Sequence, residues 1–344
     1  MPSGKSGKTR RSEAAGQGRF WKGRNVFVTG ASGLLGSWLT QRLIAEKAHV
    51  TILMRDCVPD SLLCYSGTIG ATTVVRADLE DYWSLERSLN EYEIDTVFHL
   101  GAQAIVGTAH RSPLPTFEAN VRGTYNLLEA CRVHSKSVQR VVVASSDKAY
   151  GEQKELPCVE EMALQGRQPY AVSKSCADLL AQCYAHTYGL QVVILRCGNI
   201  FGGGDRNWSR IVPGTIRSLL RRERPVIRSD GKLLRDYIYV KDVVSAYLRA
   251  AEALDDPRVA GEAFNVSNEK PLSVLTLVRE IQRLMGCAAI EPDIQNIAAG
   301  EILNQYLSAR KAHELLAWKT EYTLDSALEE TIEWYRQFLS ERGQ

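Results

Sequence analysis

The residues most able to do chemistry lie between positions 145 and 174 of this 344-residue chain. An apolar run, Val141–Val143, stops at four polar residues, Ser145, Ser146, Asp147 and Lys148. A buried parallel strand ends in this way where it delivers polar groups to the carboxyl edge of a sheet, which is where open α/β folds bind ligands. The segment therefore predicts a polar site at the end of a strand.

A Tyr–Lys pair follows in a segment that reads as the first turns of a helix. Tyr170 and Lys174 are four residues apart, so they lie on one face of that helix. A lysine beside a tyrosine stabilises the phenolate and lowers the pKa of the tyrosine. Together with the polar strand end, this pair predicts a device that handles protons.

A glycine-rich turn predicts a dinucleotide site. The turn GASGLLG, residues 30–36, lies between a strand, Asn25–Thr29, and an amphipathic helix that runs to about Lys47. Glycines there allow a tight bend and a close approach of the backbone to a pyrophosphate at the helix N-terminus. We expect cofactor contacts from this turn and from the small residues that end the strand Ile94–Leu100: Gly30, Ser32, Gly33, Leu34, Leu35, Gly36, Leu100, Gly101, Ala102 and Gln103.

The adenosine end of the cofactor is expected at the next two strands. The strand His49–Met54 ends in Arg55 and Asp56. An acidic residue there would bond a ribose hydroxyl of NAD and an arginine would meet the 2′-phosphate of NADP, so the choice between NAD and NADP stays open. Asp78 and Leu79 follow the strand Thr72–Arg76 and are expected near the adenine.

The elements that must position these residues alternate between strand and helix. Helical patterns at Tyr82–Tyr92, Thr116–His134 and Tyr170–Tyr188 separate the strands, which predicts an α/β fold of Rossmann type with a doubly wound parallel sheet. The pattern becomes mixed after Val192–Arg196. There we expect helices at 241–254, 272–285, 308–317 and 323–340 and a strand at 262–266.

This change predicts two domains with interleaved elements. Residues 21–197 are expected to bind NAD(P), and residues 198–344 are expected to form a smaller mixed α/β domain for the substrate. Residues 1–20 are rich in Gly, Ser, Lys and Arg without periodicity, so we expect a disordered tail.

Two arginines at the junctions between loops and elements are candidates for binding a diphosphate. Arg210 and Arg235 lie beside apolar stretches, and the planar guanidinium suits bidentate phosphate recognition. The arginines at 221, 222 and 224 are expected to be solvated charges on a helix. With Gln103, and with Asn199 in the glycine-dense loop 197–205, Arg210 and Arg235 make up the expected substrate contacts.

Composition excludes several classes of function. The formal net charge is only +2, which gives no strong field for nucleic acid or a membrane surface, and no apolar run approaches the roughly 20 residues of a membrane span. The eight cysteines form no C-x-x-C pair and no zinc-like cluster with histidine, so we expect no metal and a reducing cytoplasm.

These motifs together resemble the extended short-chain dehydrogenases/reductases that act on nucleotide sugars. The resemblance rests on GASGLLG, Asp78, HLGAQ at 99–103, SSDKAYG at 145–151, Tyr170-x-x-x-Lys174, CGNIFGGGD at 197–205, RIVP at 210–213 and RDYIYVKD at 235–242. It covers the chain from Trp21 to beyond Asp242. It implies a tightly bound NAD or NADP that is regenerated in each cycle, and a nucleotide-diphosphate hexose as substrate.

Within this group the chain is most similar to the 4,6-dehydratases. Those enzymes carry Thr/Ser-Asp-Glu where this chain has Ser146-Asp147-Lys148, and the CDP-glucose 4,6-dehydratases resemble it in having lysine at the third position. The resemblance implies CDP-glucose as the lead substrate, followed by GDP-mannose. A 4-epimerase of UDP-hexose type stays open, since it needs only Ser146, Tyr170 and Lys174, and a non-catalytic nucleotide-binding regulator is the remote alternative.

The resemblance also implies roles for the candidate catalytic residues Ser146, Asp147, Lys148, Tyr170 and Lys174. Tyr170 would remove the proton of the sugar 4-OH, and Asp147 and Lys148 would serve as acid at the C6 oxygen and base at C5. The two roles require Asp147 protonated and Lys148 neutral at least transiently, so a persistent ion pair would argue against them. Members of this group commonly form homodimers through two helices, here 116–134 and 170–188.

Overall fold

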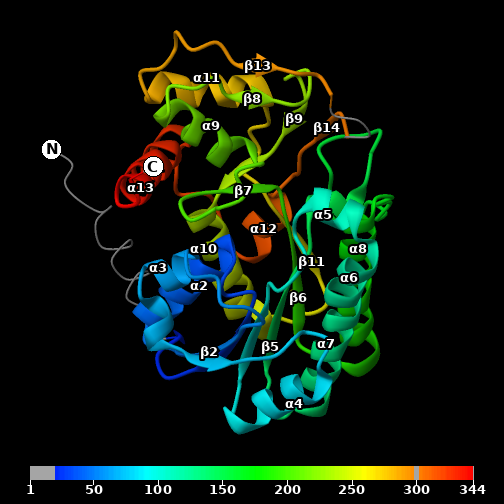
Figure 1. Ribbon diagram of the computed structural model, residues 1–344. Helices are drawn as coiled ribbons and strands as arrows, with labels where there is room; N and C mark the ends of the chain where they lie inside the picture. The colour runs from blue at the N-terminus through cyan, green and yellow to red at the C-terminus, as the bar shows by residue number, and fades with distance from the viewer. Residues whose placement is uncertain (1–19, 298–301, 344) are drawn as a thin grey trace, which may run out of the picture.

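A seven-stranded parallel sheet forms the centre of the computed structural model, which describes residues 20–297 and 302–343 (Figure 1). The strand order β3-β2-β1-β4-β5-β6-β11 confirms the doubly wound α/β arrangement. The strands are β1 Asn25–Thr29, β2 His49–Leu53, β3 Thr73–Val75, β4 Thr96–His99, β5 Arg140–Ala144, β6 Val192–Cys197 and β11 Ala263–Val266. Residues that follow the carboxyl ends of β1, β4 and β5 therefore meet at one edge of the sheet.

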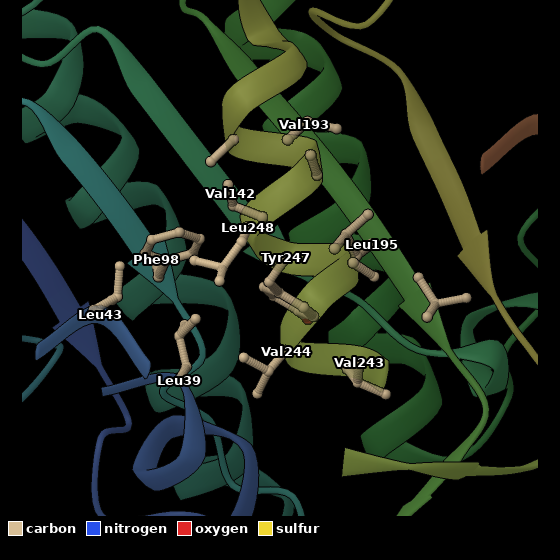
Figure 2. Close-up of a cluster of buried hydrophobic side chains, with 14 of the residues drawn as sticks. Leu39, Leu43, Phe98, Val142, Val193, Leu195, Val243, Val244, Tyr247 and Leu248 are labelled. Carbon is tan, nitrogen blue, oxygen red and sulfur yellow. The ribbon is translucent and has the colours of Figure 1, made fainter. Parts of the chain in front are cut away.

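Helices cover both faces of this sheet. Residues alternate between the faces along a strand, so Val26 and Val28 belong to one apolar cluster and Phe27 to another. Helices α2 (Leu34–Ala45) and α10 (Val240–Glu252) pack on the first face, and α4 (Tyr82–Glu91), α7 (Gly123–Val133) and α8 (Pro169–Tyr188) pack on the second. Figure 2 shows Val243, Val244, Tyr247 and Leu248 of α10 against Phe98, Val142, Val193 and Leu195 of the strands.

A smaller part of the chain lies beyond the carboxyl edge of the sheet, in the upper half of Figure 1. It has its own apolar cluster, to which helices α9, α11 and α13 contribute Ile216, Ile281 and Tyr335. Its elements are β7 Asn199–Phe201, α9 Ile211–Leu220, β8 Val226–Ile227, β9 Leu234–Arg235, β10 Tyr237–Tyr239, β12 Leu272–Ser273, α11 Val274–Leu284, β13 Asp293–Ile294, β14 Asn304–Gln305 and α13 Leu324–Ser340. The pairs β7–β10, β8–β13 and β9–β14 are parallel, and β9–β12 is antiparallel.

The remaining helical segments are short. They are α3 Leu62–Tyr65, η1 Thr68–Ala71, α5 Val106–Arg111, α6 Pro113–Phe117, η2 Glu118–Arg122, η3 Asp147–Tyr150, η4 Ala253–Asp255 and α12 Arg310–Leu315. Several longer helices begin at side chains that accept hydrogen bonds from the first turn: Asp81 for α4, Ser273 for α11 and Thr323 for α13.

The expected boundaries agree with the structure within a few residues, except for the helix expected at 116–134. This segment is divided among α6, a π-helical turn at Glu118–Arg122 and α7. The side chain of Asn120 in the π-turn bonds the backbone N–H and oxygen of Gln103, which connects the helix to the segment that follows β4.

Part of the expected tail lies outside the described residues, since the structure describes the chain only from Phe20 on. Over the described ranges, no helix combines the length and the apolar character needed to cross a membrane.

Candidate active site

A cleft of about 1190 Å³ runs along the carboxyl edge of the sheet and is closed on its other side by the smaller part of the chain. Residues that follow β1, β4, β5 and β6 line it, as do α8 and α9. Of the residues predicted from the sequence, the cleft brings together Gly30, Ser32, Gly33, Leu34, Leu35, Gly36, Leu100, Ala102, Ser146, Asp147, Lys148, Tyr170, Lys174, Asn199, Arg210 and Arg235.

Ser146 links the end of β5 to the first turn of α8. Its hydroxyl hydrogen-bonds the phenol of Tyr170 and donates to Asp147 Oδ1 at 3.0 Å. Loss of hydration raises the pKa of Tyr170, and its hydrogen bond with Ser146 only partly opposes that rise. The lowered pKa that we expected for Tyr170 is therefore wrong, because burial outweighs the groups that favour the phenolate.

Lys174 is held against the sheet. Its ammonium donates to the backbone oxygen of Ala144 at 2.8 Å, and the residue is 6% exposed. Burial lowers the pKa of Lys174 from 10.5 to about 8. Lys174 therefore loses its proton at about pH 8, well below the pH at which an exposed lysine does.

Asp147 and Lys148 form an ion pair beside Tyr170. Lys148 Nζ lies 2.8 Å from Asp147 Oδ2, and Asp147 is 2% exposed. This is the arrangement that, if it persists, argues against their acid and base roles. The backbone oxygen of Asp147 accepts a hydrogen bond from Gln305 of β14 at 2.6 Å, so the smaller part of the chain helps to fix the turn that carries the pair.

The glycine turn fits a dinucleotide. Gly30 has φ +73°, and a Cβ there would lie 2.7 Å from the nitrogen of Gly101; a Cβ on Gly36 would lie 2.1 Å from the oxygen of Gly30. The first N–H groups of a helix have no partner within it, and the cap residue of α2, Gly33, offers no side chain to bond them. Leu34 and Leu35, the first residues of α2, line the cleft, so the N-terminus of this helix offers a place for a pyrophosphate.

Six expected cofactor residues do not line this cleft. Arg55 and Asp56 pair with each other at 2.6 Å in an exposed loop, and Asp78 is exposed. Leu79 packs against Gly101 and Gly123, and the backbone of Gln103 bonds Asn120. The cleft accordingly covers the pyrophosphate and reactive parts of the predicted dinucleotide site but does not reach its expected adenosine end.

The expected substrate residues differ in how they are held. Arg210 immediately precedes α9 and pairs with Asp205 at 3.0 Å. Arg235 lines the cleft, yet its guanidinium donates to the backbone oxygens of Leu234 and Leu303, so it is already engaged with the chain. Asn199 presents a buried Nδ2 that has no hydrogen-bond partner among the described residues.

Several residues of the site had no assigned role from the sequence. Cys197 and Tyr247 line the cleft, and Gln305 supports Asp147 from a distant strand. His99 belongs to the motif HLGAQ, so the sequence contained a signal for it. Its hydrogen-bond partners, Thr29 and Thr124, come from other elements and could not be identified from that motif. Nothing in the local sequence around Gln305 marks its contact, because that contact depends on the tertiary fold.

Comparisons with known proteins agree with this geometry. Residues 26–267 match the NAD dependent epimerase/dehydratase family. A CDP-glucose 4,6-dehydratase of Salmonella typhimurium is 29% identical over 336 residues, which cover 93% of this chain and 92% of that protein. A UDP-glucose 4-epimerase of Mycolicibacterium smegmatis is 30% identical over 316 residues, which cover 90% of this chain and 98% of that protein.

Solved structures share the fold over most of the chain. A UDP-glucose 4-epimerase of Thermotoga maritima, solved with UDP-glucose, has a TM-score of 0.82 at 27% identity and covers 92% of this chain and 99% of its own. The dTDP-glucose 4,6-dehydratase DesIV of Streptomyces venezuelae, solved with NAD, has a TM-score of 0.82 at 25% identity and covers 92% and 98%. With the glycine turn, the Ser–Tyr–Lys group and the parallel sheet, these matches show that the chain belongs to the NAD-dependent epimerase/dehydratase family of extended short-chain dehydrogenases/reductases.

Proposed function

We propose that the protein is a 4,6-dehydratase that converts a nucleotide-diphosphate hexose into its 4-keto-6-deoxy form, with CDP-glucose as the lead substrate and GDP-mannose next. The observation that carries the proposal is the Asp147–Lys148 pair, which lines the cleft directly beside Ser146 and Tyr170. Loss of water across C5 and C6 needs an acid and a base beyond those that act at C4. A 4-epimerase has no use for that second pair.

The first proton moves at the 4-hydroxyl of the sugar. Tyr170 takes this proton as its phenolate, which must form against the pKa rise that burial causes, and Ser146 is hydrogen-bonded to its oxygen. Lys174 follows one turn later on α8 and is held by the backbone oxygen of Ala144. The chemistry that NAD supplies when bound is reversible hydride transfer, here from C4 and later back to C6, so there is no net oxidation. Ketone formation at C4 then makes the C5 proton acidic.

The second and third protons move at C5 and C6. Lys148 as a neutral amine removes the C5 proton, and Asp147 as a carboxylic acid protonates the C6 oxygen, which leaves as water. The ion pair and the neutral pair that the mechanism needs differ only in the position of one proton. Transfer of that proton from Lys148 Nζ to Asp147 Oδ2 across 2.8 Å makes both groups neutral. A sugar that covers the pair removes water and so favours the neutral form.

The protons also balance over the whole cycle. Lys148 returns its proton to C5 when hydride arrives at C6, while Tyr170 ends with one proton too many and Asp147 with one too few. Ser146 is hydrogen-bonded to Tyr170 and donates to Asp147 Oδ1 at 3.0 Å, so its hydroxyl can pass the proton from the phenol to the carboxylate. The only net product besides the keto sugar is water.

The cofactor and substrate residues expected from the sequence keep their roles in this proposal. The structure supports some of these roles more strongly than others. The residues that line the cleft have the stronger support. The adenosine contacts of Arg55, Asp56 and Asp78 are supported only by the position of these residues after the ends of strands. Asn199 is favoured over Arg235 as a ligand of the nucleotide, because its Nδ2 is buried without a partner among the described residues.

Domain organisation, assembly and location are also proposals. We infer that residues 21–197 mainly bind NAD and that residues 198–344 mainly bind the nucleotide sugar. A homodimer through α7 and α8 is supported by exposed apolar side chains on these helices, Tyr125, Val133, Leu179 and Tyr188. The eight free cysteines are compatible with a cytoplasmic protein.

The proposal is tested by NMR of the purified protein with NAD in D₂O, offered CDP-glucose, GDP-mannose and UDP-glucose separately. A 6-deoxy-4-keto product is expected, with solvent deuterium at C5 because a base exchanges that proton. An intact 6-hydroxyl with inverted C4 would refute dehydration. That result would establish the second candidate, a 4-epimerase, which the Ser146–Tyr170–Lys174 group and the epimerase relatives support.

A further inference from the structure

A buried histidine, His99, lies between the glycine turn and the helices that lead to Tyr170. His99 ends β4 and is 3% exposed. Its Nδ1 lies 2.9 Å from Thr29 Oγ1 at the end of β1, and its Nε2 lies 2.9 Å from Thr124 Oγ1 in α7. Both ring nitrogens therefore have hydroxyl partners from different elements.

The neighbours of these hydroxyls determine which ring nitrogen carries the proton. Thr124 Oγ1 lies 2.6 Å from the backbone oxygen of Asn120, which can only accept, so the Thr124 proton points there. His99 Nε2 must then donate to Thr124. In the neutral ring Nδ1 is then the acceptor, so Thr29 Oγ1, which accepts from the N–H of Gly101 at 3.0 Å, donates its own proton to Nδ1. A proton on Nδ1 would leave the Thr29 hydroxyl proton without this acceptor. Only the neutral Nε2–H form satisfies every group in this chain.

The surroundings also oppose a charge on the ring. Burial, with a smaller contribution from the positive charge of Lys174, lowers the pKa of His99 from 6.5 to about 3. The imidazole is therefore neutral at neutral pH, and its hydrogen bonds keep one direction.

The hydrogen-bonded chain continues from Asn120 to the catalytic helix. Asn120 Nδ2 donates to Ser173 Oγ at 2.9 Å, and Ser173 Oγ donates to the backbone oxygen of Tyr170 at 2.8 Å. At the other end, Gly101 lies against Gly30 of the glycine turn, where no Cβ would fit. The side-chain amide of Asn120 is oriented by the N–H of Gln103, which donates to its Oδ1 at 2.7 Å.

We propose that His99 is a positioning residue that holds the glycine turn and the first turn of α8 in register, and that it acts only as the neutral Nε2–H tautomer. His99 is not among the residues that line the cleft. The link to turnover rests on the proposed function, whereas its tautomer and its effect on NAD binding do not.

The tautomer can be tested directly. In protein labelled with ¹⁵N in its six histidines, His99 is assigned as the signal that disappears in His99→Gln. We expect an unprotonated Nδ1 and a protonated Nε2, unchanged between about pH 5 and pH 8, where exposed histidines titrate. Titration in that range, or a proton on Nδ1, would overturn the proposal.

Substitutions test the positioning. His99→Phe is expected to raise the dissociation constant of NAD and lower kcat, by about tenfold each, with the KM for nucleotide sugar unchanged, because Asn199 and Arg210 lie elsewhere in the cleft. His99→Gln keeps a donor near Nε2 and should restore part of the loss. Thr124→Val removes the hydrogen-bond partner of Nε2 with little change in shape, and we expect the same loss of NAD affinity and kcat as in His99→Phe. This variant also provides the test if His99→Phe does not fold.

His49→Gln is the matched control, since His49 is an exposed strand residue outside the cleft. Wild-type NAD affinity in both His99→Phe and Thr124→Val would refute the positioning role. If the wild-type protein converts no nucleotide sugar, the proposed function fails, while NAD affinity and the tautomer still decide the role of His99.

Discussion

Replacement of Lys174 by methionine should stabilise the protein while it abolishes catalysis. Burial lowers the pKa of Lys174 from 10.5 to about 8, and each pKa unit corresponds to about 1.36 kcal/mol, so the buried charge costs about 3 kcal/mol at neutral pH. Methionine has a similar volume and carries no charge. It also lacks the hydrogen bond from Nζ to Ala144 O, which returns about 1 kcal/mol, and the expected net gain is about 2 kcal/mol.

The pH dependence gives this prediction a sign that can be checked. Below about pH 8 the ammonium is present in both the folded and the unfolded chain, so the full cost of burying it is present. As the pH rises from about 8 to 10.5, the folded chain loses the proton first, and the cost disappears. The advantage of Lys174→Met over the wild type should therefore shrink over this range.

Urea unfolding at about pH 7 and about pH 9.5 measures both effects. Lys154→Met is the control, because Lys154 is exposed and lies outside the cleft. The reasoning is refuted if Lys174→Met is less stable than wild type at neutral pH, or if its advantage is equal at the two pH values. Activity should be lost in Lys174→Met at both.

Three further substitutions test other parts of the site and the fold. Lys148→Ala should stop formation of the 6-deoxy product, yet reduced nicotinamide should still appear when sugar is added; product at the wild-type rate would contradict the base role. Gly36→Ala should abolish NAD binding measured by calorimetry, because its Cβ would lie 2.1 Å from the backbone oxygen of Gly30. The control Gly70→Ala, whose Cβ would have nothing within 4 Å, should bind NAD normally. Equal affinities of the two variants would be evidence against the role of the glycine turn in holding the cofactor. Asp178→Asn should lower the free energy of unfolding by about 3 kcal/mol, since it leaves the buried guanidinium of Arg196 without its charge partner at 2.8 Å, and an unchanged urea midpoint would contradict this.

Much of the fold could be predicted because its signals are local. Strands such as Asn25–Thr29 are short apolar runs with polar ends, and α8 begins at Pro169 and ends before Gly189, so single residues mark its limits. The π-turn at Glu118–Arg122 was not predicted, and the bond between its Asn120 and the backbone of Gln103 joins segments that are separate in the sequence.

The candidate site could also be predicted where its residues follow local motifs. Ser146, Tyr170 and Lys174 follow motifs, and a parallel sheet brings the ends of its strands together whatever lies between them. The pKa of Tyr170 had the wrong expected direction, because the degree of burial is a property of the assembled cleft. The engagement of Arg235 by backbone oxygens was also hidden, since Leu303 lies 68 residues away in the sequence.

The hydrogen bond from Gln305 to the backbone of Asp147 has a consequence for biosynthesis. The two residues are 158 positions apart, so at roughly 5–20 residues per second Gln305 is made about 8–30 s after Asp147. Helix α10, which covers one face of the sheet, is also made long after the strands β1, β4 and β5 that it covers. A nascent chain therefore carries an uncovered apolar sheet and an unfinished catalytic turn during this interval, a period in which chaperones would have an exposed surface to bind.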